Sequence, residues 1–303
     1  MMAPEQVGRR VAFAGMIVSG SLAVLKIAAG VMANSNAVVS DGVESAADVV
    51  ASAIVLFGLS IAARPPDAEH PYGYGRFETL SGLAVGILLG VTGAGICFQA
   101  ALHLDDAHTV AAFALWPLLV SMIAKAALGA TKFRVGRRIN SEALVADAWN
   151  DTVDILSAFT ALVAVSLAVW KPRQFASADH FGAVGVGVIV VFLGIRVVHQ
   201  TTQQLTDRMP DGQLMDDIRR VALRVPGALG VEKCYARKTG LRYLVDLHLE
   251  VNPDLTVRDS HQIAHEVKAR ILDQLNWVAD VLVHVEPHAA GTIEAETRWR
   301  TGK

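Results

Sequence analysis

The chain has 303 residues, of which 52% are hydrophobic and only 18% charged, and its mean hydropathy is +0.39. This composition excludes an ordinary soluble protein, because apolar residues dominate nearly everything before about residue 200. The formal net charge of −2 decides nothing about partners. We expect a lipid bilayer around the protein and no binding to nucleic acid.

Six apolar stretches are long enough to cross a lipid bilayer, which takes about 20 helical residues. They lie near residues 11–32, 37–62, 79–101, 110–131, 143–170 and 181–200. Lys26 interrupts the first stretch, and Lys125 and Pro117 interrupt the fourth, so these two are less regular than the others. We therefore predict an α-helical membrane protein with six transmembrane helices.

The basic residues of the short loops lie mainly on one side of this arrangement. That side has Arg9, Arg10, Arg64, Arg76, Lys132, Arg134, Arg137 and Arg138, and the other side has only Lys171 and Arg173. Because cytoplasmic loops are enriched in lysine and arginine, both termini are predicted to be cytoplasmic. We expect the protein in a bacterial inner (plasma) membrane.

A pattern of acidic and amide side chains occurs twice, in the second and fifth stretches. Its two copies are Asp41, Glu44 and Asp48, and Asp147, Asn150 and Asp154. Spacings of three and four residues place each trio on one helix face. Ionisable groups inside a membrane are costly unless they are paired, hydrated or metal-bound, so the two faces favour an oxygen cage around a cation. Asp41 and Asp147 lie nearest the membrane boundary, where solvation or helix capping is the alternative to a place on the ion pathway.

The donors in this cage are carboxylate and amide oxygens, with no cysteine or histidine among them. Such hard ligands suit Mn²⁺, Mg²⁺ or Fe²⁺ better than Zn²⁺ or Cu⁺, although zinc also accepts carboxylates. We expect Glu44, Asp48, Asn150 and Asp154 to bind a divalent ion, with Mn²⁺ or Fe²⁺ favoured over Zn²⁺.

The segment between the second and third stretches, ARPPDAEHPYGYGRFETL, is rich in proline and glycine. Asp67 and His70 offer a weak metal site there, but a turn that only connects two helices is the simpler interpretation. Gly82, Gly86 and Gly90 follow at four-residue spacing. A stripe of small residues lets another helix approach closely, so this one predicts helix packing.

After about residue 207 the pattern becomes that of a soluble α+β domain. We predict a membrane domain over 1–207, a cytoplasmic domain over 208–288 and an unstructured tail over 289–303. The cytoplasmic domain should have the order α-β-β-α-β. A turn at Thr239-Gly240 separates its first two strands, and a capping box from Thr256 to Asp259 opens its second helix.

Histidines are concentrated in this cytoplasmic domain. His248 lies within a strand, His261 begins a helix, and His284 shares a strand face with Glu286. We predict that these residues form a metal site. His265 and His288 are interpreted as structural or solvated.

With these residues in view, the chain resembles the cation diffusion facilitator family over nearly all of residues 9–288. The segments NSNAVVSDGVESAADVVASAIVLFG, HPYGYGRFETLSG and SEALVADAWNDTVDILSA resemble the family's second span, the following loop and the fifth span. LVDLHLEV, DSHQIAHEVKARI and VLVHVEPH resemble its metallochaperone-like cytoplasmic domain.

The resemblance assigns a role to each candidate residue. It implies a transport site of Glu44, Asp48, Asn150 and Asp154, a cytoplasmic site of His248, His261, His284 and Glu286, a peripheral loop site at Asp67 and His70, and a hinge ion pair of Arg76 with Asp207. Tyr74 and Glu232 stand where relatives often have histidine. Zinc-transporting members usually have histidine at the position of Asn150, and manganese-type members are richer in aspartate and asparagine.

The resemblance also implies an activity. We expect a secondary active transporter rather than an enzyme, a homodimer formed through the cytoplasmic domain, and efflux of Mn²⁺ or Fe²⁺ in exchange for protons. The alternatives are a Zn²⁺ or Co²⁺ exporter of the same family and a metal-sensing or scaffold member. Two rival functions lie outside this family. One is an intramembrane aspartyl protease built on Asp48 and Asp154, and the other is a passive cation channel.

Overall fold

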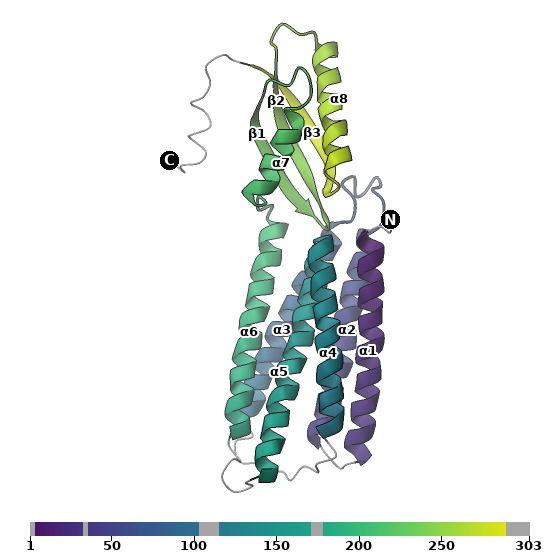
Figure 1. The fold of residues 1–303 in the computed structure, drawn as a ribbon, viewed down its shortest axis with the longest axis vertical. Helices are drawn as coiled ribbons and strands as arrows, with labels where there is room; N and C mark the ends of the chain where they lie inside the picture. Colours follow the sequence, from purple (N-terminus) through teal and green to yellow (C-terminus); the bar gives the residue numbers. More distant parts are fainter. Residues whose placement is uncertain (1–3, 33–35, 103–114, 171–177, 289–303) are drawn as a thin grey trace. The chain divides into compact units, whose positions relative to one another are not determined.

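The computed structural model describes residues 4–32, 36–102, 115–170 and 178–288. The chain separates into two compact units, Met1–Gln203 and Gln204–Lys303. Within the described ranges the first unit is built of long helices, and the second of three strands and two helices (Figure 1). The predicted tail over 289–303 lies outside the described residues.

Six long helices make up the described part of the first unit. They are α1 (Pro4–Met32), α2 (Asn36–Ala62), α3 (Arg76–Leu102), α4 (Leu115–Ile139), α5 (Glu142–Trp170) and α6 (Ala178–Leu205). The shortest has 25 residues and the longest 29, which suffices for a hydrocarbon layer about 30 Å thick. Within the described residues, α1 over Pro4–Ala29 and α3 over Arg76–Phe98 are long and apolar enough to cross a membrane.

The fourth helix runs past its predicted end at residue 131. The basic segment that contains Arg137 and Arg138 continues α4 to Ile139, where cationic side chains interact favourably with the helix dipole. Asn140, at φ 57°, ends the helix. Lys132 is therefore a residue of α4, and its side chain is buried. Its assignment to a cytoplasmic loop was wrong.

A buried carboxylate fixes the start of α5. Glu78 of α3 accepts hydrogen bonds through Oε1 from Ser141 Oγ (2.8 Å) and from the Ala143 N–H (2.9 Å). Ser141 Oγ in turn accepts the Leu144 N–H at 3.1 Å. These bonds satisfy N–H groups that the first turn of a helix leaves without partners, and they tie α3 to α5.

Gly82 and Gly86 of the predicted glycine stripe in α3 serve helix packing, whereas a Cβ atom on Gly90 would have nothing within 4 Å. A Cβ atom on Gly82 would lie 3.1 Å from the backbone nitrogen of Ala143 in α5, and one on Gly86 would lie 2.8 Å from Val197 in α6. A Cβ on Gly194 of α6 would approach the Gly90 nitrogen to 2.6 Å. Larger residues would therefore push α5 and α6 away from α3.

The second unit has the predicted order α-β-β-α-β. Its elements are α7 (Gly212–Ala222), β1 (Gly230–Thr239), β2 (Arg242–Val251), α8 (Val257–Gln274) and β3 (Val278–Pro287). The sheet order is β1-β2-β3, with β1 antiparallel and β3 parallel to β2. Ile218 of α7, Leu247 of β2 and Ile271 of α8 are fully buried in one shared core. Thr256 caps α8, because its side chain accepts the Asp259 N–H.

Candidate metal sites

The two acidic faces meet between α2 and α5. Asp48 of α2 and Asn150 and Asp154 of α5 are all buried, with at most 9% of each residue exposed. The Asn150 side-chain amide donates a hydrogen bond to Asp48 Oδ1 at 2.5 Å. The structure therefore brings three of the four predicted donors together. Glu44 and Asp41 lie in α2, but their side chains are outside the described residues.

Lys125 of α4 reaches into this group of oxygens. Its Nζ lies 2.9 Å from Asp48 Oδ2 and 2.7 Å from Asp154 Oδ2, and 2.9 Å from Asp151 Oδ1. It also donates to Ser19 Oγ of α1 at 3.1 Å. The lysine side chain is completely buried, so an ammonium group stands among the carboxylates of the candidate site.

A second lysine extends the same network along α4. Lys132 Nζ lies 2.9 Å from Asp147 Oδ2 and 2.7 Å from Asp151 Oδ2. Ser52 of α2 donates to the Asp147 carboxylate at 3.1 Å. Asp147 is thus fully buried and ion-paired, and the solvated alternative considered for it was wrong.

The connected group has more negative than positive side chains. Within the described residues, the carboxylates of Asp48, Asp147, Asp151 and Asp154 form ion pairs with Lys125 and Lys132, which leaves a formal charge of −2 when all six side chains are ionised. Buried charge is expensive unless it is compensated, and one divalent cation would compensate this excess. Among its described members, the group offers carboxylate and amide oxygens.

Sequence reasoning missed Lys125, Lys132 and Asp151 as members of the group. The two lysines are seven residues apart and so share a face of α4, as the acids do on α2 and α5. Treated as one set, two lysines and four aspartates on helical spacing inside apolar segments would have predicted a buried ion network.

The predicted loop site has a structural role of its own. Asp67 Oδ1 accepts the N–H groups of Glu69 (3.0 Å) and His70 (2.7 Å), and Oδ2 accepts the Tyr74 hydroxyl at 2.6 Å. The hydrogen bond from Tyr74 lowers the pKa of Asp67. The His70 ring packs on Tyr74 with centroids 4.1 Å apart. These contacts organise the loop, and a metal at Asp67 and His70 stays a prediction.

The predicted hinge pair stays a prediction as well. Arg76 is the first residue of α3. Asp207 follows α6 in the left-handed region, at φ 59°. The two residues belong to different compact units, each of which is described by itself.

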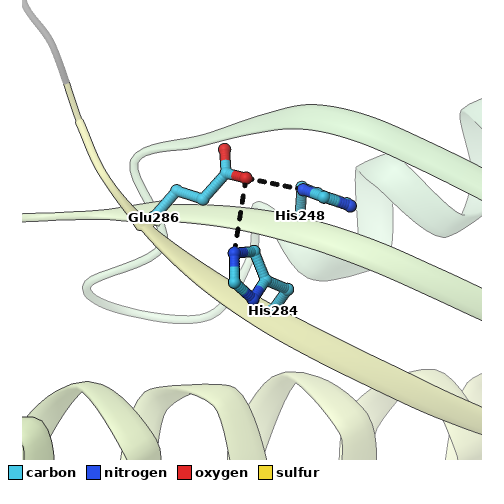
Figure 2. A group of neighbouring side chains, drawn as sticks. All are labelled: His248, His284 and Glu286. Carbon is cyan, nitrogen blue, oxygen red and sulfur yellow. Dashed lines mark hydrogen bonds and ion pairs between the residues drawn. The ribbon is translucent and has the colours of Figure 1, made fainter.

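The second unit contains a compact group of metal-ligating side chains. His248 of β2 and His284 of β3 occupy paired positions in the parallel register. Glu286 Oε1 lies 2.6 Å from His248 Nδ1 and 3.6 Å from His284 Nε2 (Figure 2). One ligand atom from each residue lies within 4.8 Å of the others. His248 alternates with buried Leu247 and Leu249, so the group lies on the sheet face away from the core.

The electrostatics of this group favour a charged Glu286. A hydrogen bond with Glu232 and then the contact with His248 lower the pKa of Glu286. A carboxylate that stays ionised and faces two imidazole rings is a suitable ligand set for a transition-metal dication. The three residues His248, His284 and Glu286 form the tail cluster, a name that refers to the second unit and not to the predicted tail over 289–303.

The remaining histidines lie elsewhere in the second unit. His261 is exposed on α8, with its ring 4.5 Å from that of His265, and it does not join the tail cluster. His288 Nδ1 contacts Glu250 Oε2 at the end of the sheet. Three of the four residues predicted for the cytoplasmic site therefore lie together, with His261 on a separate element, and metal binding there stays a prediction.

Two family profiles match the chain. The profile described as "Cation efflux transmembrane domain" matches residues 12–206, and the profile described as "Cation efflux protein, cytoplasmic domain" matches residues 210–288. Together they cover both compact units of the structure.

Several curated proteins are similar along most of their length. The manganese efflux system protein MneP of Bacillus subtilis is 31% identical over 291 residues, which cover 94% of this chain and 97% of that protein. The magnetosome protein MamB of Magnetospirillum gryphiswaldense is 29% identical, over 86% of this chain and 88% of that protein. The cation-efflux pump FieF of Pectobacterium atrosepticum is 27% identical, over 89% of each.

Among solved structures, the fragment MamM-CTD 215-293 is 29% identical and covers 25% of this chain and 96% of its own, with a TM-score of 0.25. The decisive match is that of the transmembrane profile, which spans well over half of the residues. The chain belongs to the cation diffusion facilitator family of integral membrane cation efflux transporters.

Proposed function

We propose that the protein exports Mn²⁺ or Fe²⁺ in exchange for protons, through a transport site made by Glu44, Asp48, Asn150 and Asp154. The observation that carries the proposal is the buried meeting of Asp48, Asn150 and Asp154 between α2 and α5. In a membrane helix bundle, buried ionisable side chains that face one another mark an ion pathway.

The choice of metal rests on the donor atoms. Carboxylate and amide oxygens are hard ligands that favour Mn²⁺ and Fe²⁺. A relative at 31% identity is named as a manganese efflux protein, which agrees with this choice. Zinc also accepts carboxylates, so a Zn²⁺ or Co²⁺ exporter is the alternative within the family, and a metal sensor or scaffold with little transport is the other.

Proton coupling follows from competition for the same oxygens. A carboxylate must lose its proton before it can bind a metal, and a bound dication keeps the proton away. Loading of the metal on one side and of protons on the other would then drive antiport. Rocking of helix bundles about a site near the middle of the membrane would provide alternating access.

We propose a regulatory or structural metal in the tail cluster and a homodimer formed through the second unit. A profile of the family's cytoplasmic domain matches this unit, and a metal bound there would stabilise the form that binds it. We also propose that both termini lie in the cytoplasm and that the protein lies in a bacterial inner membrane; the basic residues of the loops support this orientation.

Proteoliposomes with an imposed pH gradient test the transport proposal. Wild type should accumulate Mn²⁺ only when the gradient is present, and Asp48→Asn or Asp154→Asn should abolish this uptake. The control is Asp280→Asn, which removes an exposed carboxylate of β3 outside both candidate sites. Uptake that ignores the gradient would indicate a channel, and metal binding without any flux would indicate a sensor.

A further inference from the structure

We propose that Lys125 is a tethered counter-cation: its ammonium group occupies the metal-free transport site, and the incoming metal must displace it from Asp48 and Asp154. The inference rests on the proposed transport site and adds a residue that sets its affinity and its release of metal. Lys125 comes from α4, a helix that contributes no donor to the predicted site.

The ammonium group and the metal would compete for the same atoms. Lys125 Nζ contacts Asp48 Oδ2 and Asp154 Oδ2 at 2.9 and 2.7 Å. A divalent ion bound to these two carboxylates would lie roughly 2.0–2.2 Å from their oxygens. Two cations held this close in a buried site repel each other strongly, so metal binding requires the ammonium group to move away.

Asp151 provides the place to which Lys125 withdraws. It is buried, it is not among the predicted donors, and it contacts Lys125 through Oδ1 at 2.9 Å. Its other oxygen, Oδ2, contacts Lys132 at 2.7 Å. Lys125 can therefore release Asp48 and Asp154 and keep one carboxylate partner, which avoids the large cost of an unpaired buried charge.

This exchange has two consequences for transport. Competition from Lys125 weakens metal binding relative to a site without the lysine. The return of the ammonium group to Asp48 and Asp154 promotes release of the metal, because both carboxylates regain a positive partner as the ion leaves. Removal of Lys125 should therefore tighten binding and slow turnover.

The test compares two charge-conserving double variants in the full-length protein. Lys125→Met/Asp151→Asn removes the tethered cation together with its second partner. Lys268→Met/Asp280→Asn removes an ion pair of the second unit and leaves the buried charge group of the first unit intact. The reference protein and both double variants carry His284→Ala and Glu286→Ala, so that Mn²⁺ titration in nanodiscs reports the membrane site.

We expect Lys125→Met/Asp151→Asn to bind Mn²⁺ at least about tenfold more tightly, and the affinity of Lys268→Met/Asp280→Asn to stay within about threefold of the reference protein. In proteoliposomes the first variant should lower KM and kcat together. Unchanged or weaker binding in the first variant, or equal tightening in both, would overturn the inference. No Mn²⁺ binding by the wild-type membrane site would overturn the proposed site and this inference together.

A measurement on wild type covers the case in which the first variant fails to fold. Structures solved with and without Mn²⁺ should show Lys125 Nζ near Asp48 and Asp154 only in the metal-free state, and near Asp151 in both. A metal-bound structure in which Lys125 keeps its contacts with Asp48 and Asp154 would overturn the inference.

Discussion

Asn150 of α5 donates its side-chain amide to Asp48 Oδ1 of α2, and this hydrogen bond joins the two helices that carry the predicted donors. The amide nitrogen of Asn150 is thereby engaged as a donor, and the amide oxygen is the atom that would bind a metal. In the proposed transport site Asn150 would therefore act as a neutral oxygen ligand.

Replacement of this oxygen by an imidazole nitrogen should change the choice of metal. We expect Asn150→His to raise the ratio of Zn²⁺ to Mn²⁺ flux by about tenfold or more, because nitrogen ligands suit zinc better than manganese. Flux of each ion into proteoliposomes under one pH gradient measures the ratio. Asn150→Asp, which keeps an oxygen donor, is the control. A wild type that already prefers zinc would contradict the hard-ligand argument and leave the transporter assignment intact.

The Lys132–Asp147 pair should behave as a coupled buried ion pair. Lys132→Met leaves the buried Asp147 carboxylate without its lysine, and we expect it to destabilise the protein by about 3–5 kcal/mol. Lys132→Met/Asp147→Asn should recover most of that loss. Thermal unfolding of Lys132→Met, Asp147→Asn and the double variant in detergent gives the coupling energy. Additive losses would show that the two side chains act independently.

A metal in the tail cluster should stabilise the second unit. At a free metal concentration of 100 times Kd, binding adds about 2.7 kcal/mol to the free energy of unfolding. We expect His284→Ala to remove this gain, measured as the shift in thermal unfolding between chelator and added metal. His265→Ala is the matched control, because His265 is exposed on α8 outside the cluster. An equal loss in both variants would place the metal elsewhere.

Cys234 should make the second unit sensitive to alkaline pH. Burial raises the pKa of its thiol from 9.0 to about 11. The unfolded chain therefore loses this proton first as pH rises, so the contribution is fully present below about pH 9 and declines through pH 11, by at most about 1.4 kcal/mol per unit.

In Cys234→Ala this decline should disappear, whereas Cys97→Ala should keep it. Urea unfolding between pH 8 and 11 measures the slope. The signal is the fluorescence of Trp277, whose ring packs on Tyr243 in the second unit, in chains whose other tryptophans have been replaced. Equal slopes in wild type and Cys234→Ala would show that other groups cause the pH dependence.

The sequence predicted the parts of the fold that depend on local periodicity. The apolar stretches located the helices, and alternation around Leu247 with the Thr256 cap located the elements of the second unit. Asp48, Asn150 and Asp154 were found for the same reason, since each trio repeats at helical spacing within a single helix. Such patterns are fixed by the backbone geometry of one element.

Contacts between elements were harder to predict. Lys125 interrupted an apolar stretch and was taken as an irregularity, because its partners lie on α2 and α5, far away along the chain. His261 was grouped with His248 on residue type, but the distance between α8 and the outer sheet face depends on packing that no spacing reveals. Charge balance over the whole membrane segment is the signal that would have pointed to Lys125 and Lys132.

The bond from Glu78 to the first turn of α5 has a mechanical consequence. It fastens α3 to α5, and the close approach of Gly86 and Gly194 presses α3 against α6. A tilt of α5 would therefore carry α3 and α6 with it as a single body. The contacts of α5 with α2 and α4 include ion pairs and a hydrogen bond between side chains. A cation that binds these carboxylates would exchange these contacts and so loosen α5 from α2 and α4.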